Sequence, residues 1–224
     1  MDKLAVSKSR HNIDGMPPEL EIVNYSKQEG ERQKNYIEGF YQGLPGEFLK
    51  AKDSRLYDEV MSCSNIAVVR GEFDDSATFS YLKNTIGIIQ AVMETGVKAI
   101  LDLQIMQWFE PEEWSKKFFE PMSPNVFEHV VILESGENGG TWLHTRGMRK
   151  FGRPDLSIRK VTPDKMELGV EIINRFIQAF AHGVIPDEKR EIKIRNSAGG
   201  IFGRLLGDYE NMDFSNYYFE IDGI

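Results

Sequence analysis

One strand–helix–strand pattern limits the possible folds of this chain more than any other feature. A β-branched run at residues 65–70 is typical of a short buried strand, and the apolar run at 97–103 is typical of another. Between them, apolar residues recur every three or four positions, as on one side of a helix: Phe79, Leu82, Ile86, Ile89 and Met93. Asp75 or Ser76 is suited to cap this helix. A strand, a helix and a strand with short connections predict a right-handed parallel crossover.

An antiparallel hairpin is expected further along the chain. Residues 127–135 and 141–146 are strand-like, and the glycine-rich stretch 136–140 between them is a suitable turn. A further strand is expected at 155–161. A second strong helical pattern covers residues 162–182, so it provides another apolar face for a sheet.

The register of this hairpin is left open by the sequence. If Ser135 opposes Thr141, His144 opposes Ile132, and His129 and His144 point to opposite faces of the sheet. A slip of one residue places the two histidines on the same face. The pattern therefore does not predict a histidine pair.

The length and composition fit a single domain. The chain has 224 residues, of which 41% are hydrophobic and 28% are charged. Weaker patterns indicate strands near 20–23 and 190–195 and helices near 28–42, 53–61 and 110–120. The expected fold class is α+β or α/β, with a mixed β-sheet, a parallel βαβ crossover, an antiparallel hairpin and helices packed on the sheet. We expect a loose arm at residues 1–18 and one domain at 19–224.

The net charge of −8 argues against two classes of partner. An acidic chain repels the phosphates of nucleic acids and the anionic surface of membranes. No stretch approaches the roughly 20 apolar residues of a membrane span. A lone cysteine, Cys63, fits a reducing compartment, and the first residues lack the apolar run of a signal peptide. We therefore expect a soluble cytoplasmic protein.

Residues 144–155 form the densest unusual segment. It holds His144 and four basic side chains around two glycines, in an otherwise acidic chain. Arginine side chains can hold phosphate or carboxylate groups through two contacts at once, so Arg146, Arg149 and Arg153 are candidate ligands of an anion. The competing interpretation is that these side chains pair with carboxylates of the protein or face water.

Other candidate sites are weaker. Trp108 lies in an aromatic cluster that could line an apolar pocket, although such clusters more often form core. Acidic residues around Glu72 and Asp102 could hold Mg²⁺, but helix capping and solvation explain them as well. The glycine-rich stretch 197–204 lacks the lysine and serine of a phosphate-binding loop, which favours a flexible turn. We expect no metal and no cofactor.

Short motifs in the chain resemble bacterial domains of unknown function. They are Val97–Leu103, Trp108–Phe109, Pro111–Trp114, Thr145–Met148 and Phe151–Asp155. The resemblance covers roughly residues 65–180. It implies a bacterial source and an α/β domain, and it implies no activity.

Two functions remain open at the level of the sequence. The favoured one is a non-catalytic binding or interaction protein, with a small anion or another protein as partner, because no catalytic constellation is specific enough. The alternative is a hydrolase or transferase acting on an anionic small molecule. In that case the arginines hold the anion, His144 supplies acid–base chemistry and Asp102 orients it. The sequence does not indicate an oligomeric state.

Overall fold

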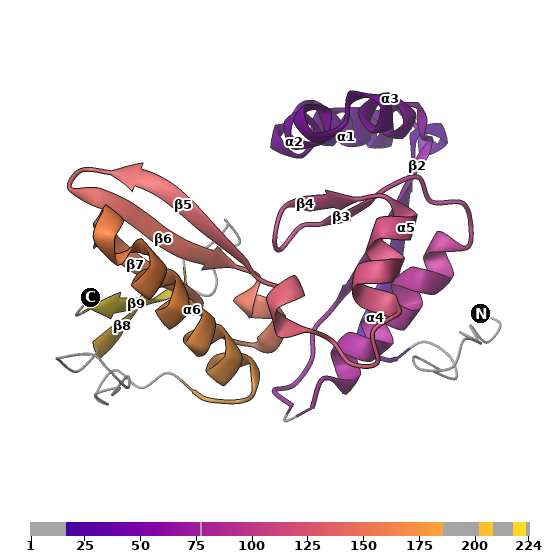
Figure 1. The fold of residues 1–224 in the computed structure, drawn as a ribbon. Coiled ribbons are helices and arrows are strands. Elements are labelled where there is room, and N and C mark those ends of the chain that lie inside the picture. The colour runs from indigo at the N-terminus through magenta and orange to yellow at the C-terminus, as the bar shows by residue number, and fades with distance from the viewer. Residues whose placement is uncertain (1–16, 77, 186–201, 208–216, 223–224) are drawn as a thin grey trace. The chain divides into compact units, whose positions relative to one another are not determined.

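The computed structural model describes residues 17–76, 78–185, 202–207 and 217–222, and they form two compact units (Figure 1). Unit 1 contains the chain up to Asp74 together with residues 79–124. Unit 2 contains residues 75–78 and the chain from Asn125 onwards. Most of the expected arm at 1–18 and the strand expected at 190–195 lie outside the described residues.

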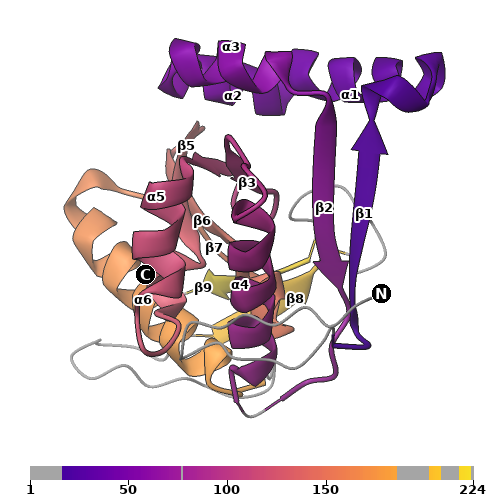
Figure 2. The same cartoon turned by 90° about the vertical axis from the view of Figure 1, so that its right-hand side faces the viewer.

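Unit 1 combines helices with two small antiparallel sheets. Its elements are β1 (Leu20–Ser26), the 3-10 turn η1 (Lys27–Glu29), α1 (Glu31–Gln42), α2 (Leu44–Lys52), α3 (Ser54–Ser62), β2 (Asn65–Gly71), α4 (Ser80–Met93), β3 (Ile100–Asp102), β4 (Gln107–Phe109), α5 (Pro111–Trp114) and the π-helical turn η2 (Ser115–Phe119). Helices α1, α2 and α3 lie together at one end of the long β1–β2 ribbon (Figure 2). The expected helices are therefore present, and α2 was not expected.

The parallel crossover was assigned to the wrong strands. Strand β2 pairs antiparallel with β1, and β3 pairs antiparallel with β4. The spacing of apolar residues identifies a strand but does not identify the strand with which it pairs. The expected burial of β2 is also wrong, because its residues are exposed or half-exposed. The helix between them forms as α4, but Phe79 occupies its N-cap without a side-chain bond. Ser76 instead accepts a hydrogen bond from the Thr78 backbone at 3.2 Å.

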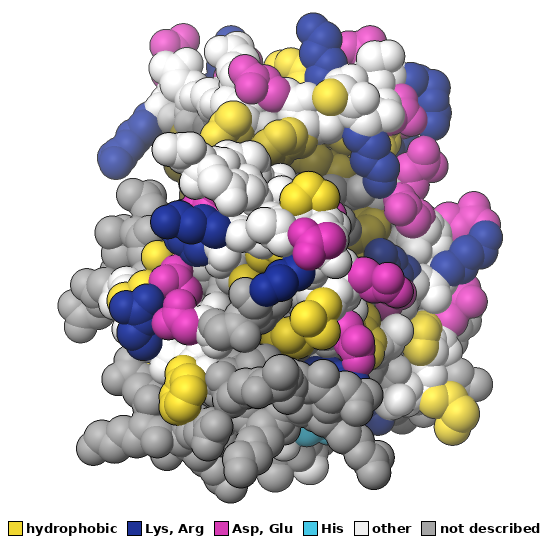
Figure 3. All heavy atoms as spheres, turned by 60° about the vertical axis from the view of Figure 1, so that its left-hand side comes forward, with side chains coloured by type: hydrophobic (Ala, Val, Ile, Leu, Met, Phe, Trp, Pro, Cys, Tyr) yellow, Lys and Arg dark blue, Asp and Glu magenta, His cyan; other side chains and the backbone are white. Residues whose placement is uncertain are grey.

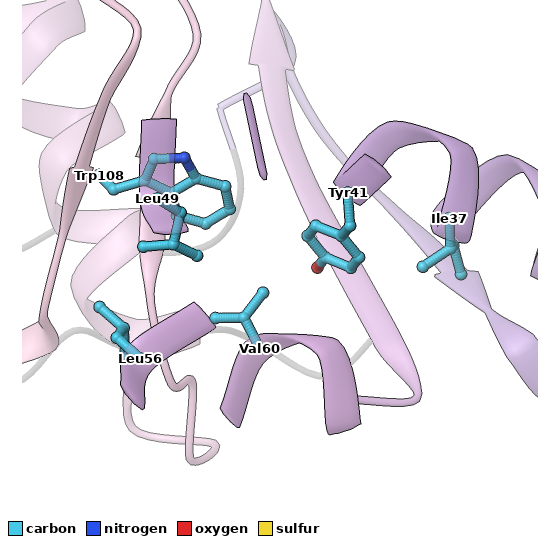
Figure 4. Close-up of a cluster of buried hydrophobic side chains, with 6 residues drawn as sticks. All are labelled: Ile37, Tyr41, Leu49, Leu56, Val60 and Trp108. Carbon is cyan, nitrogen blue, oxygen red and sulfur yellow. The ribbon is translucent and has the colours of Figure 1, made fainter. Parts of the chain in front are cut away.

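The core of unit 1 lies between the three N-terminal helices and β4. Six buried side chains form it: Ile37, Tyr41, Leu49, Leu56, Val60 and Trp108 (Figure 4). Leu56 and Val60 are four residues apart on α3, whose N-cap Asp53 accepts hydrogen bonds from the backbone of Arg55 and Leu56. Helix α3 is thus fixed at its first turn, and its apolar face points into the cluster.

Unit 2 is a five-stranded mixed sheet covered on one face by a long helix. Its elements are η3 (Val126–Glu128), β5 (Val131–Glu137), β6 (Gly140–Arg146), η4 (Met148–Phe151), β7 (Asp155–Val161), η5 (Pro163–Lys165), α6 (Met166–Ala181), β8 (Phe202–Leu206) and β9 (Tyr218–Asp222). The strand order is β5-β6-β7-β9-β8. Strands β7 and β9 are parallel, and the chain between them includes α6. The α+β fold with a mixed sheet, an antiparallel hairpin and helices is confirmed.

Helix α6 packs its apolar stripe against this sheet. Ile173, Ile177 and Phe180 are almost fully buried, as the sequence pattern predicts. Both Phe176 and Phe180 contact Phe219 of β9. The ring centroid of Phe219 lies 5.9 Å from that of Phe176 and 5.6 Å from that of Phe180. Among the described residues, no helix has the length and apolar character needed to cross a membrane.

Candidate functional site

The predicted basic loop is a short 3-10 turn between two strands of unit 2. Strand β6 ends at Arg146, and η4 carries Arg149 and Lys150 before β7 begins. Gly147 and Gly152 flank the turn with φ angles of 113° and 65°, which residues with a side chain rarely adopt. The two glycines therefore give the turn its shape, as the sequence suggested.

Arg153 is held by internal partners. Its side chain is only 6% exposed, and its Nη2 lies 3.0 Å from a carboxylate oxygen of Asp75. Its Nε donates to the Val184 carbonyl at 3.1 Å, and Nη1 donates to that of Gly152 at 3.0 Å. These contacts tie three segments of unit 2 together, so we leave Arg153 out of the candidate site.

Asp75 is therefore engaged in this ion pair rather than in the helix cap or metal site considered from the sequence. Among the described residues, no group of three histidine, cysteine or acidic side chains is arranged to hold a metal ion.

Arg146 and Arg149 differ in their surroundings. Arg149 is exposed, whereas Arg146 is half-buried at the end of β6. Burial lowers the pKa of the Arg146 guanidinium below its ordinary value, and the nearby Asp155 carboxylate raises it by less. Desolvation of the guanidinium is therefore the larger cause of this shift.

Asp155 connects the turn to the sheet. Its Oδ1 accepts hydrogen bonds from the Thr145 hydroxyl at 3.0 Å and from the Met148 backbone at 3.2 Å. Burial raises the pKa of Asp155 to about 6, although these bonds and the charges of Arg146 and Lys150 act in the opposite direction.

His144 lies on the same strand as Arg146 and is only 8% exposed. Its ring stacks on Trp142 at a centroid distance of 3.9 Å. Burial, together with the charges of Arg146 and Arg159, lowers its pKa, and a backbone hydrogen bond at Trp142 raises it by less than burial lowers it. The environment of His144 therefore favours the neutral imidazole.

Sequence reasoning missed three neighbours of His144. The indole Nε1 of Trp142 donates to the Ser157 hydroxyl at 2.8 Å, and the Arg159 guanidinium lies 4.2 Å from the centre of the indole ring. Residues two apart in a strand share a face, so alternation along β6 places Trp142 beside His144. Ser157 and Arg159 come from β7, and the sequence predicted the pairing of β6 with β5 but not its pairing with β7.

The hairpin register is now defined. Ser135 opposes Trp142 and His144 opposes Leu133, one residue away from the register considered first. His129 lies outside β5, at the end of η3, and is also buried. The two histidines are therefore not partners across the hairpin.

The remaining candidates, Asp102 and Trp108, belong to unit 1. Asp102 accepts a hydrogen bond from the Gln104 backbone at 3.0 Å. Trp108 is part of the buried cluster, and its Nε1 donates to the Pro45 carbonyl at 2.7 Å (Figure 4). Trp108 is therefore a residue of the hydrophobic core, as the second interpretation of the aromatic cluster predicted.

A surface groove of about 650 Å³ runs along α6 in unit 2. Phe127, Val170 and Ala179 are among its lining residues, as are Arg175 and Glu171, which form an ion pair. Basic and acidic side chains are interspersed on the face of the molecule shown in Figure 3. Arg175 lies on α6, outside the 146–149 segment, so it serves as a control arginine for Arg149.

No family model matches this chain, and no curated protein and no solved structure matches it either.

Proposed function

We propose that this protein is a non-catalytic binding protein that holds a small anion at residues 146–149. The observation that carries the proposal is the placement of two arginines at one end of a strand: Arg146 ends β6, half-buried, and Arg149 lies on the turn that follows. The electrostatic attraction between an anion and the half-buried guanidinium of Arg146 is stronger than that to a fully hydrated guanidinium, because the local dielectric constant is lower. Phosphate, sulfate and carboxylate groups match the planar fork of arginine.

Arg149 supports the same proposal from the neighbouring turn. Its side chain is exposed, and the turn that carries it is fixed by hydrogen bonds from Lys150 to Gly147 and from Gly152 to Arg149, both 3.0 Å long. A fixed backbone reduces the entropy that is lost when the side chain closes on a ligand. In this proposal Arg149 supplies the second guanidinium for the anion.

The proposed ligand is a small molecule or a single anionic group, and not a nucleic acid. The net charge of −8 opposes a long polyphosphate, while one anion needs only a local positive site. A cytoplasmic location in a bacterium is part of the proposal. It rests on the lone cysteine and on the resemblance to bacterial domains.

The enzymatic alternative has less support. It gives Asp102 the role of orienting His144, whereas the Asp102 carboxylate accepts a hydrogen bond from the Gln104 backbone. The pKa of His144 is lowered, so the imidazole is a poor source of protons at neutral pH. We therefore favour binding over catalysis.

A thermal-shift screen with sulfate, phosphate and small carboxylates tests this function. An anion at about 100 times its dissociation constant should stabilise the native state by roughly 2.7 kcal/mol. Arg149→Ala should abolish this gain, which is measured relative to the same variant without ligand. Arg175→Ala is the matched control and should keep the gain. Equal gains in both variants, or no gain in the wild type, would contradict the proposal.

A further inference from the structure

The turn between β5 and β6 carries an asparagine followed by a glycine. Strand β5 ends at Glu137 and β6 begins at Gly140, so Asn138 and Gly139 form the tip of the hairpin (Figure 1). Asn138 is the only asparagine of the chain that precedes a glycine. Gly139 has a φ angle of 95°, which glycine adopts without strain. The turn therefore needs this glycine, and no side chain shields the peptide nitrogen that follows Asn138.

The surroundings of this dipeptide are open. Both residues are exposed, and a Cβ added at Gly139 would meet no atom within 4 Å. Asparagine in a turn often binds the backbone two residues further on, which holds its side chain in place. In the part of the chain that the structure describes, neither the carboxamide of Asn138 nor the N–H of Gly139 has a hydrogen-bond partner. The two groups are thus free to approach each other.

We propose that Asn138 is a site of spontaneous deamidation. The backbone nitrogen of Gly139 gives its proton to hydroxide and forms a bond to Cγ of Asn138, and the carboxamide nitrogen leaves as ammonia. Both reacting groups belong to adjacent residues, so the attack is intramolecular and closes a five-membered imide ring. Water then opens the ring. Cleavage of the new N–Cγ bond gives aspartate, whereas cleavage of the original peptide bond gives isoaspartate, whose main chain passes through Cγ.

Two other exposed asparagines provide an internal comparison. Asn24 and Asn35 are each followed by a tyrosine, and the next peptide nitrogens lie within β1 and α1. Ring closure at these positions requires the backbone to leave a strand or a helix, which costs free energy. Exposure alone therefore does not predict the reaction at these two residues.

Isoaspartate adds one atom to the backbone of a turn that is closely packed at its base. Glu137 and Gly140 are paired, and a Cβ added at Gly140 would lie 2.7 Å from the carbonyl carbon of Lys160 on β7. Glu137 also accepts a hydrogen bond from the Lys160 backbone and pairs with Arg159 at 3.1 Å. Because the length of a hairpin turn fixes the register of its strands, the added atom should disturb these contacts. Aspartate keeps the original backbone and changes only the charge.

Peptide mapping by mass spectrometry of the full chain, incubated at about pH 8 and 37 °C, tests the modification. Exchange of the amide for a carboxylate raises the mass of the peptide that contains residue 138 by about 1 Da, and isoaspartate is detected by enzymatic methylation. We expect both products at Asn138 in the folded protein, formed faster than any change at Asn24 or Asn35. Asn138→Ser lacks the carboxamide and is the control. The proposal is wrong if Asn138 keeps its amide in the folded protein, or if it reacts no faster than Asn24 and Asn35.

Thermal unfolding tests the expected effect on the hairpin. The isoaspartate form is separated by chromatography and compared with wild type and with Asn138→Asp, which carries the new charge on an unchanged backbone. We expect the midpoint of the isoaspartate form to lie at least about 2 °C below that of Asn138→Asp. Equal midpoints of these two forms would overturn the expected disturbance of the turn.

Discussion

Three arginines of one short segment have different surroundings, and burial is what distinguishes them. Arg153 is buried among carbonyl groups and Asp75, Arg146 is half-buried, and Arg149 is exposed. The sequence places all three beside or between two glycines that permit left-handed turns, but it could not predict which one is buried. That depends on Val184 and Asp75, which are distant in the chain and are brought together only by the fold.

Removal of the Arg153 side chain should destabilise the protein. Arg153→Ala leaves the carbonyls of Val184 and Gly152 without this donor, so we expect a loss of about 2–3 kcal/mol in the free energy of unfolding. Asp75→Asn is the control and should cost less than Arg153→Ala, because the amide oxygen of the variant can still accept a hydrogen bond from the Arg153 guanidinium. Urea denaturation measures both. Equal losses would show that the ion pair, rather than the buried hydrogen bonds, stabilises the segment.

Asp155 should make stability depend on pH in a defined direction. Its pKa is about 6 in the folded protein and 3.8 ordinarily, so between about pH 4 and 6 the folded state holds a proton that the unfolded state has released. Stability from this group is therefore lost as pH rises through this range. The asparagine of Asp155→Asn does not titrate, so the variant does not lose this stability. Its free energy of unfolding, relative to that of the wild type, should therefore increase by about 1–3 kcal/mol from pH 4 to pH 8.

Denaturant titrations at several pH values measure this difference. A difference between variant and wild type that stays constant from pH 4 to pH 8 would show that burial does not raise the pKa of Asp155.

At the level of elements, helices were predicted better than strand partners. The stripe on α6 required only local spacing, and its central residues are buried as expected. Strands β2 and β3 were located correctly, but each pairs with a strand that local spacing does not reveal. Partner choice depends on which faces remain uncovered after the helices pack, and that is a property of the whole unit. For the same reason, β7 was not predicted as the neighbour that brings Ser157 and Arg159 to His144.

Truncation of α6 tests whether its buried face stabilises unit 2. Ile173 is fully buried, so Ile173→Ala should cost about 2–5 kcal/mol in the free energy of unfolding. Leu168 lies on the same helix but is 41% exposed, and Leu168→Ala should cost well under half of that. Chemical denaturation followed by circular dichroism compares the two. A neutral Ile173→Ala would mean that the inward face of α6 is wrongly assigned.

At the scale of the whole molecule, the chain passes between the two units three times. Residues 75–78 belong to unit 2, yet the residues on both sides of them belong to unit 1. Arg153 holds Asp75 within this short inserted segment. When unit 2 unfolds, residues 75–78 lose their contacts, and these residues are joined on both sides to unit 1. We therefore expect the unfolding of the two units to be coupled.

We accordingly expect one cooperative thermal transition, as the prediction of a single domain requires. Differential scanning calorimetry of wild type and Ile173→Ala measures it, and the variant should shift the whole transition. Two separate transitions, with only one displaced by the substitution, would show that the units unfold independently.

The central claim is that an anion binds at Arg146 and Arg149, and nuclear magnetic resonance tests it most directly. Sulfate is titrated into the isotope-labelled full chain while the arginine Nε signals and the backbone amides of 147–150 are followed. The account predicts saturable shifts, largest at Arg146 and Arg149, that disappear in Arg149→Ala. Small shifts that do not saturate and that affect Arg175 as strongly as Arg149 would reflect ionic strength alone and would contradict the claim.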